Sequence, residues 1–300
     1  MIREFLRKLC CCDGPPATGK RSAAEPIQPV VQAPPRSERV VTDPAEQKWL
    51  ESVVTNKRYV AFIDVLAYKT LVADPGIQPD TVHAQFLYDV WEDMLQAFRR
   101  MLALSPDVEA ILFSDSVYLS SVEPHALVAA IGLLYMDVYG WFRGHPEKWL
   151  PWLRCGIGHG WIMIVHDPAT ARLAGEGRGA FRNPAGPALL QAVHLSELKE
   201  APGMRILAPQ SIFDALRVPP AKPLDPTAAF VLDKLIAPPG PAVAATLPEG
   251  TVVDLPWWRL VDEPATRIAL WREHEWQAGY GNISRARVHY DATLELIARA

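Results

Sequence analysis

Two apolar runs, each interrupted by one aspartate, constrain this chain more than any other feature. The first is Tyr-Val-Ala-Phe-Ile-Asp-Val-Leu-Ala-Tyr-Lys at residues 59–69, and the second is Ile-Leu-Phe-Ser-Asp-Ser at residues 111–116. Short apolar runs of this kind are typical of buried strands. Burying a carboxylate is costly unless it is paired or coordinates a cation. The two interruptions, Asp64 and Asp115, therefore predict a cation shared by both carboxylates.

Size and composition are those of an ordinary globular protein. The chain has 300 residues, of which 49% are hydrophobic and 21% charged, so it can bury a substantial core. Its net charge of -4 does not favour nucleic-acid binding. No apolar run approaches the roughly 20 residues that span a bilayer, so no integral membrane segment is expected. Four cysteines, three of them consecutive at residues 10–12, make no disulfide framework and favour a reducing, cytoplasmic compartment.

The composition divides the chain into three regions. Residues 1–43 are rich in proline, alanine and serine, which predicts a disordered or linker arm. Residues 44–216 carry alternating strand and helix patterns and form the predicted domain. Residues 217–300 begin with a proline-rich stretch and are expected to pack on the same domain as a loop-rich and then mostly helical extension.

The periodicity predicts the order β-α-β-β-α-β, followed by a further helix and strand. The expected elements are a strand at 58–65, a helix at 80–103, strands at 108–113 and 117–121, a helix at 124–142, a strand at 153–165, a helix at 187–199, a strand at 204–207, a helix at 209–216, a strand at 257–260 and helices within 264–300. This order is that of a ferredoxin-like, split βαβ sheet. The expected fold class is therefore α+β, with helices on one face of the sheet.

This topology predicts where the two aspartates lie. The first and third strands of a split βαβ sheet are antiparallel neighbours, so Asp64 would lie beside Asp115 in the hairpin at 114–116. Adjacent carboxylates repel unless they share a proton or a divalent ion. Oxygen ligands suit Mg²⁺ or Mn²⁺, and a triphosphate would supply further oxygens. The alternative is that each aspartate only caps a turn or a helix.

These segments resemble the motifs of the class III nucleotidyl cyclase catalytic domain, over roughly residues 57–215. In that family one metal aspartate lies in Phe-x-Asp-Ile-x-Gly-Phe, matched by Phe-Ile-Asp-Val-Leu-Ala-Tyr at 62–68, and a second lies on a hairpin, matched by Phe-Ser-Asp-Ser at 113–116. A phosphate-binding arginine opens Arg-x-Gly-Ile-x-x-Gly, matched by Arg-Cys-Gly-Ile-Gly-His-Gly at 154–160. A glycine-containing turn enters the helix that carries the transition-state residues, and residues 183–192 have that form.

The resemblance implies a set of site residues and a homodimer with its active site at the subunit interface. The implied metal contacts, for two Mn²⁺ or Mg²⁺ ions, are Asp64, Val65 and Asp115; the catalytic residues are Asp64, Asp115 and Arg154; the nucleotide-binding residues are Phe62, Tyr68, Lys69, Arg154, Asn183 and His194. The family's transition-state asparagine and arginine would fall near Leu190 and His194, so the asparagine is absent and His194 is a partial substitute. Arg178 and Arg182 are alternative replacements.

Departures from the family pattern indicate a subtype. Adenylyl cyclases read adenine with a lysine before the second aspartate, whereas residues 111–113 contain none. Asn183 takes the place of the second base reader, and an amide both donates and accepts hydrogen bonds, as a pyrimidine edge requires. The chain looks most like the bacterial pyrimidine cyclases of the Pycsar antiphage system. Those enzymes make cyclic UMP or cyclic CMP, to which a separately encoded effector protein responds.

Three functions stay open at the level of the sequence. The favoured one is a pyrimidine cyclase acting on a nucleoside triphosphate, with UTP preferred over CTP. The second is a purine cyclase, adenylyl or guanylyl, with an altered base pocket. The third is a degenerate cyclase fold that binds nucleotide as a sensor module without turning it over.

Overall fold

The computed structural model describes residues 56–66, 81–112, 116–141, 152–166, 182–248, 250–277 and 284–299, together with residues 44 and 48. The chain separates into two units, residues 1–42 and 43–300, and every described residue belongs to the second. The expected arm at residues 1–43 lies outside the described residues.

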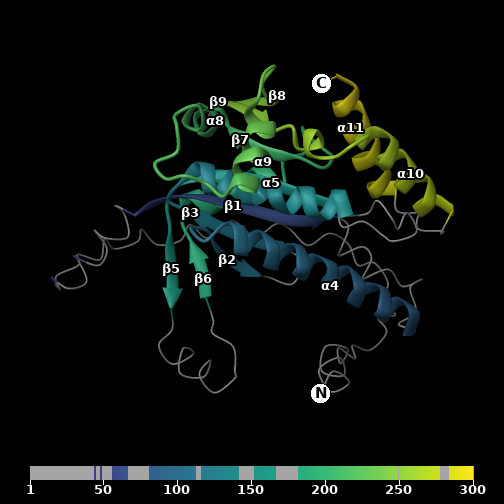
Figure 1. Ribbon diagram of the computed structural model, residues 1–300, viewed down its shortest axis with the longest axis horizontal. Helices are drawn as coiled ribbons and strands as arrows, with labels where there is room; N and C mark the ends of the chain where they lie inside the picture. Colours follow the sequence, from purple (N-terminus) through teal and green to yellow (C-terminus); the bar gives the residue numbers. More distant parts are fainter. Residues whose placement is uncertain are drawn as a thin grey trace, which may run out of the picture. The chain divides into compact units, whose positions relative to one another are not determined.

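A seven-stranded sheet organises the second unit (Figure 1). The elements are β1 (Lys57–Leu66), α4 (Thr81–Leu104), β2 (Glu109–Leu112), β3 (Ser116–Ser121), α5 (Pro124–Trp141), β4 (Trp152–Trp161), β5 (Met163–His166), β6 (Arg182–Ala185), α7 (Pro187–Ser196), β7 (Ile206–Pro209), α8 (Gln210–Leu216), α9 (Pro226–Ile236), β8 (Ala242–Leu247), β9 (Gly250–Asp254), the 3-10 helix η2 (Trp257–Leu260), α10 (Pro264–Gln277) and α11 (Ser284–Arg299). The strand order is β2-β3-β1-β4-β7-β9-β8.

The first four strands of the sheet have the predicted split βαβ topology. β1 is antiparallel to both β3 and β4, and β2 is antiparallel to β3. The chain then adds β7 parallel to β4, and β9 and β8 extend the sheet beyond it by antiparallel pairing. The α+β fold class with a ferredoxin-like sheet is therefore confirmed, and the expected strands and helices up to residue 142 agree with it to within two residues at each end.

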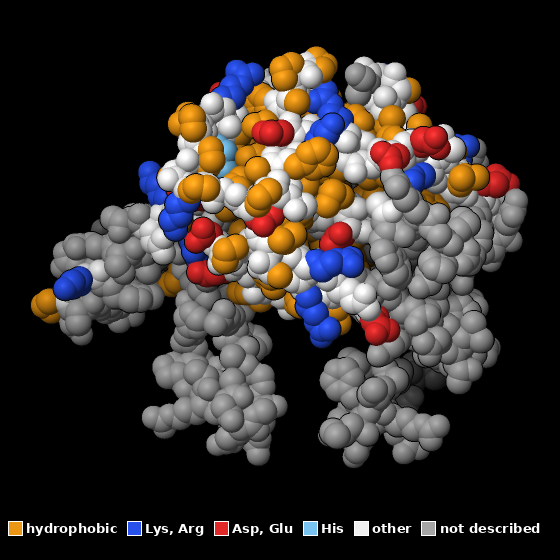
Figure 2. All heavy atoms as spheres, in the orientation of Figure 1, with side chains coloured by type: hydrophobic (Ala, Val, Ile, Leu, Met, Phe, Trp, Pro, Cys, Tyr) orange, Lys and Arg blue, Asp and Glu red, His pale blue; other side chains and the backbone are white. Residues whose placement is uncertain are grey.

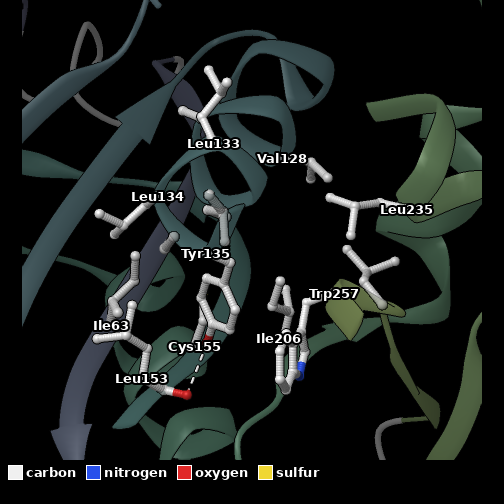
Figure 3. Packing of buried hydrophobic residues seen from close by; sticks show 14 of the residues in the cluster. Ile63, Val128, Leu133, Leu134, Tyr135, Leu153, Cys155, Ile206, Leu235 and Trp257 are labelled. Carbon is white, nitrogen blue, oxygen red and sulfur yellow. Dashed lines mark hydrogen bonds between the residues drawn. The ribbon is translucent and has the colours of Figure 1, made fainter. Parts of the chain in front are cut away.

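The main core lies between one face of the sheet and α5. Along β1 the side chains of Ala61, Ile63 and Val65 enter this core, as the alternation of a strand requires. α5 is buried on nearly all sides because α4 and α9 also contact it. Figure 3 shows Tyr135 of α5 among these side chains, with its hydroxyl 3.1 Å from the carbonyl oxygen of Leu153. The apolar composition of α5 thus reflects a helix enclosed by other elements.

α7 packs on the opposite face of the sheet, so the helices are shared between both faces and not gathered on one. Gly156 and Gly158 of β4 make this close approach possible. A Cβ at Gly156 would collide with the carbonyl oxygen of Ala192, and one at Gly158 with that of Ala188. Gly156 of the Arg-x-Gly-Ile-x-x-Gly motif, and Gly158 at one of its variable positions, therefore serve helix packing.

The single long strand expected at 153–165 is wrong, because the chain changes direction at Ile162. β4 ends at Trp161, and β5 pairs with β6 in a separate two-stranded ribbon (Figure 1). The Ile162 side chain is buried in a small cluster with Ala188 and Ala192 of α7. This contact turns the backbone out of the sheet. The ribbon also includes residues 182–185, so the expected glycine-containing turn at 183–192 begins in a strand.

The C-terminal region is more regular than its proline content indicates. Residues 217–249, expected as a loop-rich excursion, contain α9 and β8. The Asp225 side chain caps α9 by accepting hydrogen bonds from the backbone N–H groups of Thr227 and Ala228, and Pro226 occupies the first turn. Residues 257–260 form η2 and not the expected strand, because Pro256 cannot donate to a ladder and Trp257 Nε1 donates to the carbonyl oxygen of Met204. The expected C-terminal helices are confirmed as α10 and α11, which lie side by side (Figure 1).

The surface seen in Figure 2 mixes charge and apolar area. Lysine and arginine side chains are interspersed with aspartate and glutamate over the described part of this face, with hydrophobic side chains between them. Among the helices within the described ranges, none has both the length and the apolar character needed to cross a membrane.

The packing of α7 on β4 predicts a steep cost for adding one methyl group. Gly156→Ala should lower the free energy of unfolding by about 3 kcal/mol or more, because the new Cβ meets backbone atoms that cannot move without displacing α7. The matched control is Gly140→Ala in α5, where a Cβ meets no atom within 4 Å and where helix propensity favours alanine. Urea unfolding of both variants tests this, and similar midpoints for the two would contradict it.

Candidate functional site

The sheet brings Asp64 and Arg154 together. In the antiparallel ladders, Asp64 on β1 lies opposite Ser116 on β3 and opposite Arg154 on β4. Directly opposed residues present their side chains on the same face. Gly156 and Gly158 lie two and four residues after Arg154 on the same strand, so they are on the same face of the sheet as Arg154. Since α7 packs against these two glycines, Asp64 and Arg154 lie on the face that α7 covers. Two of the four resembling motifs, those of Asp64 and Arg154, are therefore neighbours in space.

The second aspartate lies at an undescribed position between two described strands. Asp115 is outside the described residues, but Leu112 of β2 and Val117 of β3 are paired, so the intervening residues connect adjacent antiparallel strands. Ser116, the next residue along the chain, lies opposite Asp64. The contact between the carboxylates of Asp64 and Asp115 stays a prediction.

Arg154 is a buried cation held by main-chain carbonyl groups. Only 4% of its surface is exposed, and its Nη2 donates hydrogen bonds to the carbonyl oxygens of Leu198 and of Ala201, the latter at 3.0 Å. Burial, and next the nearby Arg205, lower the pKa of Arg154 to about 10, which keeps the side chain positively charged at neutral pH. Its Nε is buried and has no hydrogen-bond partner among the described residues. Arg154 therefore retains one N–H donor for a further acceptor, and phosphate oxygens are acceptors that a guanidinium binds well.

The described donor atoms fit a hard divalent cation in part. The Asp64 carboxylate is half-buried at the end of β1 and lies opposite the Ser116 hydroxyl, which gives the oxygen chemistry that Mg²⁺ and Mn²⁺ prefer. Val65 points the other way, and its side chain is buried in the main core, so only its carbonyl oxygen could contact a metal. No group of three or more histidine, cysteine or acidic side chains gathers in the described part of the chain. The complete ligand set depends on Asp115, which is not described.

The remaining predicted nucleotide-binding residues are dispersed. Phe62 is half-buried on the same face as Asp64, next to the Val60 and Tyr118 cluster. Tyr68 and Lys69 lie outside the described residues. The residues expected in the loop before α7 include Asn183, which instead belongs to β6 and pairs with Val165.

His194 does not join Asp64 within one subunit. It lies in the last turn of α7, exposed, one turn after Leu190, which is 72% exposed. The buried side of the helix consists of Ala188, Ala192 and Leu195. The helix positions implied for transition-state residues therefore face away from this subunit's sheet.

A buried ion pair next to Arg154 was missed at the level of the sequence. Asp254, at the end of β9, is fully buried, and Arg205 Nη1 lies 2.8 Å from its Oδ2. Burial raises the pKa of Asp254 to about 6, while Arg205 acts in the opposite direction. The signal was present, because Val-Val-Asp-Leu at 252–255 is a third apolar run interrupted by an aspartate. It was overlooked because the C-terminal region was interpreted as an extension.

The C-terminal helix is part of the same neighbourhood. His289 Nδ1 of α11 accepts a hydrogen bond from the backbone N–H of Gly203 at 3.0 Å, and Thr293 Oγ1 accepts one from that of Met204 at 2.9 Å. The ring of Tyr290 meets Trp152 of β4 edge to face, with centroids 3.5 Å apart. Burial, with Arg154 as a second cause, lowers the pKa of His289 to about 4.

Comparisons with known proteins give no family by sequence. No protein-family model matches the chain, and no curated protein matches it. Among solved structures, a bacterial light-regulated adenylyl cyclase has a TM-score of 0.46 and 14% identity, covering 73% of this chain and 97% of its own. The guanylyl cyclase Cya2 has a TM-score of 0.45 and 8% identity, covering 66% and 91%, and an adenylate cyclase from Trypanosoma brucei has 0.43 and 16%, covering 70% and 92%. Values this low do not establish kinship, so we base the function on the chain's own residues.

The contact between His289 and Gly203 predicts a pH dependence of stability. The folded protein favours neutral His289, whose pKa falls from 6.5 to about 4. Its contribution is therefore fully present above about pH 6.5 and is lost as the pH falls toward 4. His289→Asn keeps an acceptor but cannot titrate, so its unfolding free energy should depend less on pH across this interval. Urea unfolding between pH 4 and 7 measures this, and parallel pH profiles for the two proteins would contradict the prediction.

Proposed function

We propose that this protein is a nucleotidyl cyclase that converts a pyrimidine nucleoside triphosphate, UTP in preference to CTP, into its 3′,5′-cyclic monophosphate and pyrophosphate. The observation that carries the proposal is the register of β1, in which Asp64 lies opposite both Ser116 and Arg154. The predicted topology placed Asp64 beside the hairpin at 114–116, and the second ladder of β1 adds Arg154 as the neighbour on the other side. Their adjacency supports the resemblance independently of the low similarity to solved structures.

The reaction needs a nucleophile already present in the substrate. The ribose 3′-oxygen forms a bond to the α-phosphorus, the bond from that phosphorus to the bridging oxygen breaks, and pyrophosphate leaves with the bond's electron pair. The hydroxyl proton passes to solvent. Asp64 and Asp115 are the residues that would hold Mg²⁺ or Mn²⁺, which when bound lowers the pKa of the hydroxyl and neutralises phosphate charge.

Arg154 has the properties of a phosphate ligand. It is cationic at neutral pH, and its unpartnered Nε can donate to a phosphate oxygen. A charged donor that is already buried and oriented loses little freedom when the substrate binds. Arg154 would therefore stabilise the charge that develops on the departing pyrophosphate.

A second copy of the chain completes the proposed site. Leu190 and His194 lie on the exposed side of α7, where they are accessible to a partner subunit and not to this subunit's Asp64. A two-fold axis would place both subunits' helices over each other's sheets. Homodimerisation in the cytosol thus belongs to the proposal.

The proposed preference for pyrimidines rests on the absence of a lysine at residues 111–113, where adenylyl cyclases read adenine. Ile111 is half-buried on β2 opposite Tyr118, and Leu112 is 46% exposed, so neither provides the donor that a lysine would give to a purine. By resemblance, we extend the proposal to antiphage defence, with the cyclic nucleotide acting on a separately encoded effector protein.

A nucleotide-binding module without turnover is the second candidate. The observation that favours it is Leu190, an apolar side chain at the position implied for the transition-state asparagine. The alternative function retains nucleotide binding but makes no cyclic product, so the product assay separates the two.

Removing the described metal carboxylate tests the chemistry. Asp64→Asn should lower turnover at least about 100-fold in the presence of Mn²⁺, because an amide oxygen is a much weaker ligand than a carboxylate. The control is Asp233→Asn on the exposed surface of α9, which should retain turnover. Cyclic nucleotide is quantified by chromatography, with circular dichroism to check folding. Full turnover by folded Asp64→Asn protein would exclude the proposed metal role.

The four nucleoside triphosphates test the base. With Mn²⁺ and each substrate in turn, kcat/KM should be higher for UTP and CTP than for the purines, because an apolar residue stands at the adenine-reading position. The resemblance places UTP ahead of CTP. Cyclic AMP or cyclic GMP as the main product would overturn the pyrimidine preference and leave the cyclase assignment. Binding of UTP without any cyclic product would favour the nucleotide-binding module.

A further inference from the structure

The turn after α7 holds Arg154 from one side and is itself held by α11 from the other. The carbonyl oxygens of Leu198 and Ala201 accept hydrogen bonds from Arg154 Nη2. Two and three residues after Ala201, the backbone N–H groups of Gly203 and Met204 donate to His289 and Thr293 of α11. Hydrogen bonds therefore link the C-terminal helix to the buried guanidinium through one short segment.

This turn has little freedom to rearrange. Gly203 has a φ of 106°, a left-handed conformation that favours glycine, and a Cβ there would lie 2.8 Å from Thr293 Oγ1. Arg205 Nε donates to the carbonyl oxygen of Pro202 at 2.8 Å while its Nη1 pairs with Asp254. The turn is thus hydrogen-bonded to α11 through Gly203 and Met204, and to β9 through Arg205.

The position of Arg154 depends on this turn. Among the described residues, Arg154 Nη2 donates to two main-chain carbonyl oxygens, and both belong to the segment that follows α7. A main-chain carbonyl has no rotamers, so it moves only when its backbone moves. Displacement of the turn would consequently move the guanidinium or leave a buried charge with fewer partners, which is unfavourable.

We propose that His289 and Thr293 are positioning residues for Arg154, and that the C-terminal helix α11 thereby sets the affinity of the site for phosphate groups. This positioning role rests on the proposed function, because it requires Arg154 to bind phosphate. It assigns the C-terminal extension a role in the site, although α11 contributes no atom to the reaction. Anything that displaces α11 would lower phosphate affinity without altering the metal carboxylates.

A double-mutant cycle tests whether His289 acts through Arg154. The proteins are the wild type, His289→Leu, Arg154→Ala and the double variant, and the measurements are KM for UTP with Mn²⁺ and the inhibition constant of pyrophosphate. His289→Leu should raise both constants about tenfold with a smaller change in kcat. In the Arg154→Ala background the same substitution should have no further effect.

Three other variants separate positioning from general destabilisation. His289→Asn places an amide oxygen near the position of Nδ1 and should restore the wild-type constants. Thr293→Val removes the acceptor for Met204 at nearly constant volume and should act like His289→Leu, which also covers the case in which that variant fails to fold. Glu295→Gln, on the exposed side of α11 and paired with Arg299, should change neither constant.

The outcomes distinguish the two proposals. A lower melting temperature with unchanged KM and pyrophosphate inhibition in His289→Leu would overturn the positioning role, as would equal effects with and without Arg154. If the wild type makes no cyclic nucleotide, the proposed function fails, and the same cycle is measured as pyrophosphate affinity by calorimetry. Pyrophosphate affinity that does not change in Arg154→Ala would overturn the positioning proposal together with the phosphate role of Arg154.

Discussion

The hydrogen-bonded position of β1 between β3 and β4 is the constraint on which the rest of the structure depends. Two antiparallel ladders fix its register, so its alternating side chains are assigned to faces without ambiguity. Ala61, Ile63 and Val65 enter the main core, whereas Phe62 and Asp64 lie on the side of α7. A slip of one residue would bury the carboxylate of Asp64 in the main core. Stability and the candidate site therefore depend on the same pairing.

The local hydrophobic pattern predicted the helices and strands that are strongly apolar or that pair with elements close in the sequence. The helix at 80–103 and the strands around Asp64 and Asp115 were identified because their periodicity is regular, and the split βαβ order then placed Asp64 next to the start of the third strand. The part of the site that could be predicted was the part that strand order determines. It placed Asp64 beside the hairpin at 114–116, whereas the pairing of Asp64 with Arg154 emerged only from the structure.

Long-range contacts account for what the sequence did not predict. The resemblance implied phosphate binding by Arg154, but nothing in the sequence predicted its hydrogen bonds to carbonyl groups 44 and 47 residues later in the chain. The break at Ile162 depends on packing against α7, and η2 depends on a Trp257 bond to Met204. α9 could have been found from its Asp-Pro start, but the proline count of the region outweighed this local signal. In this region the proline content predicted a loop, whereas the capping residues indicated the helix that is present.

The extension of the sheet by β7, β9 and β8 has a consequence for how the protein is made. During synthesis β7 emerges well before β9, so a nascent chain presents a strand edge whose permanent neighbour does not yet exist. Unpaired strand edges are templates for association with other chains. The last third of the sequence, which covers β7 with β9 and joins α11 to the turn at 201–204, would end that vulnerable period. Premature termination would therefore yield aggregates and not a smaller folded protein.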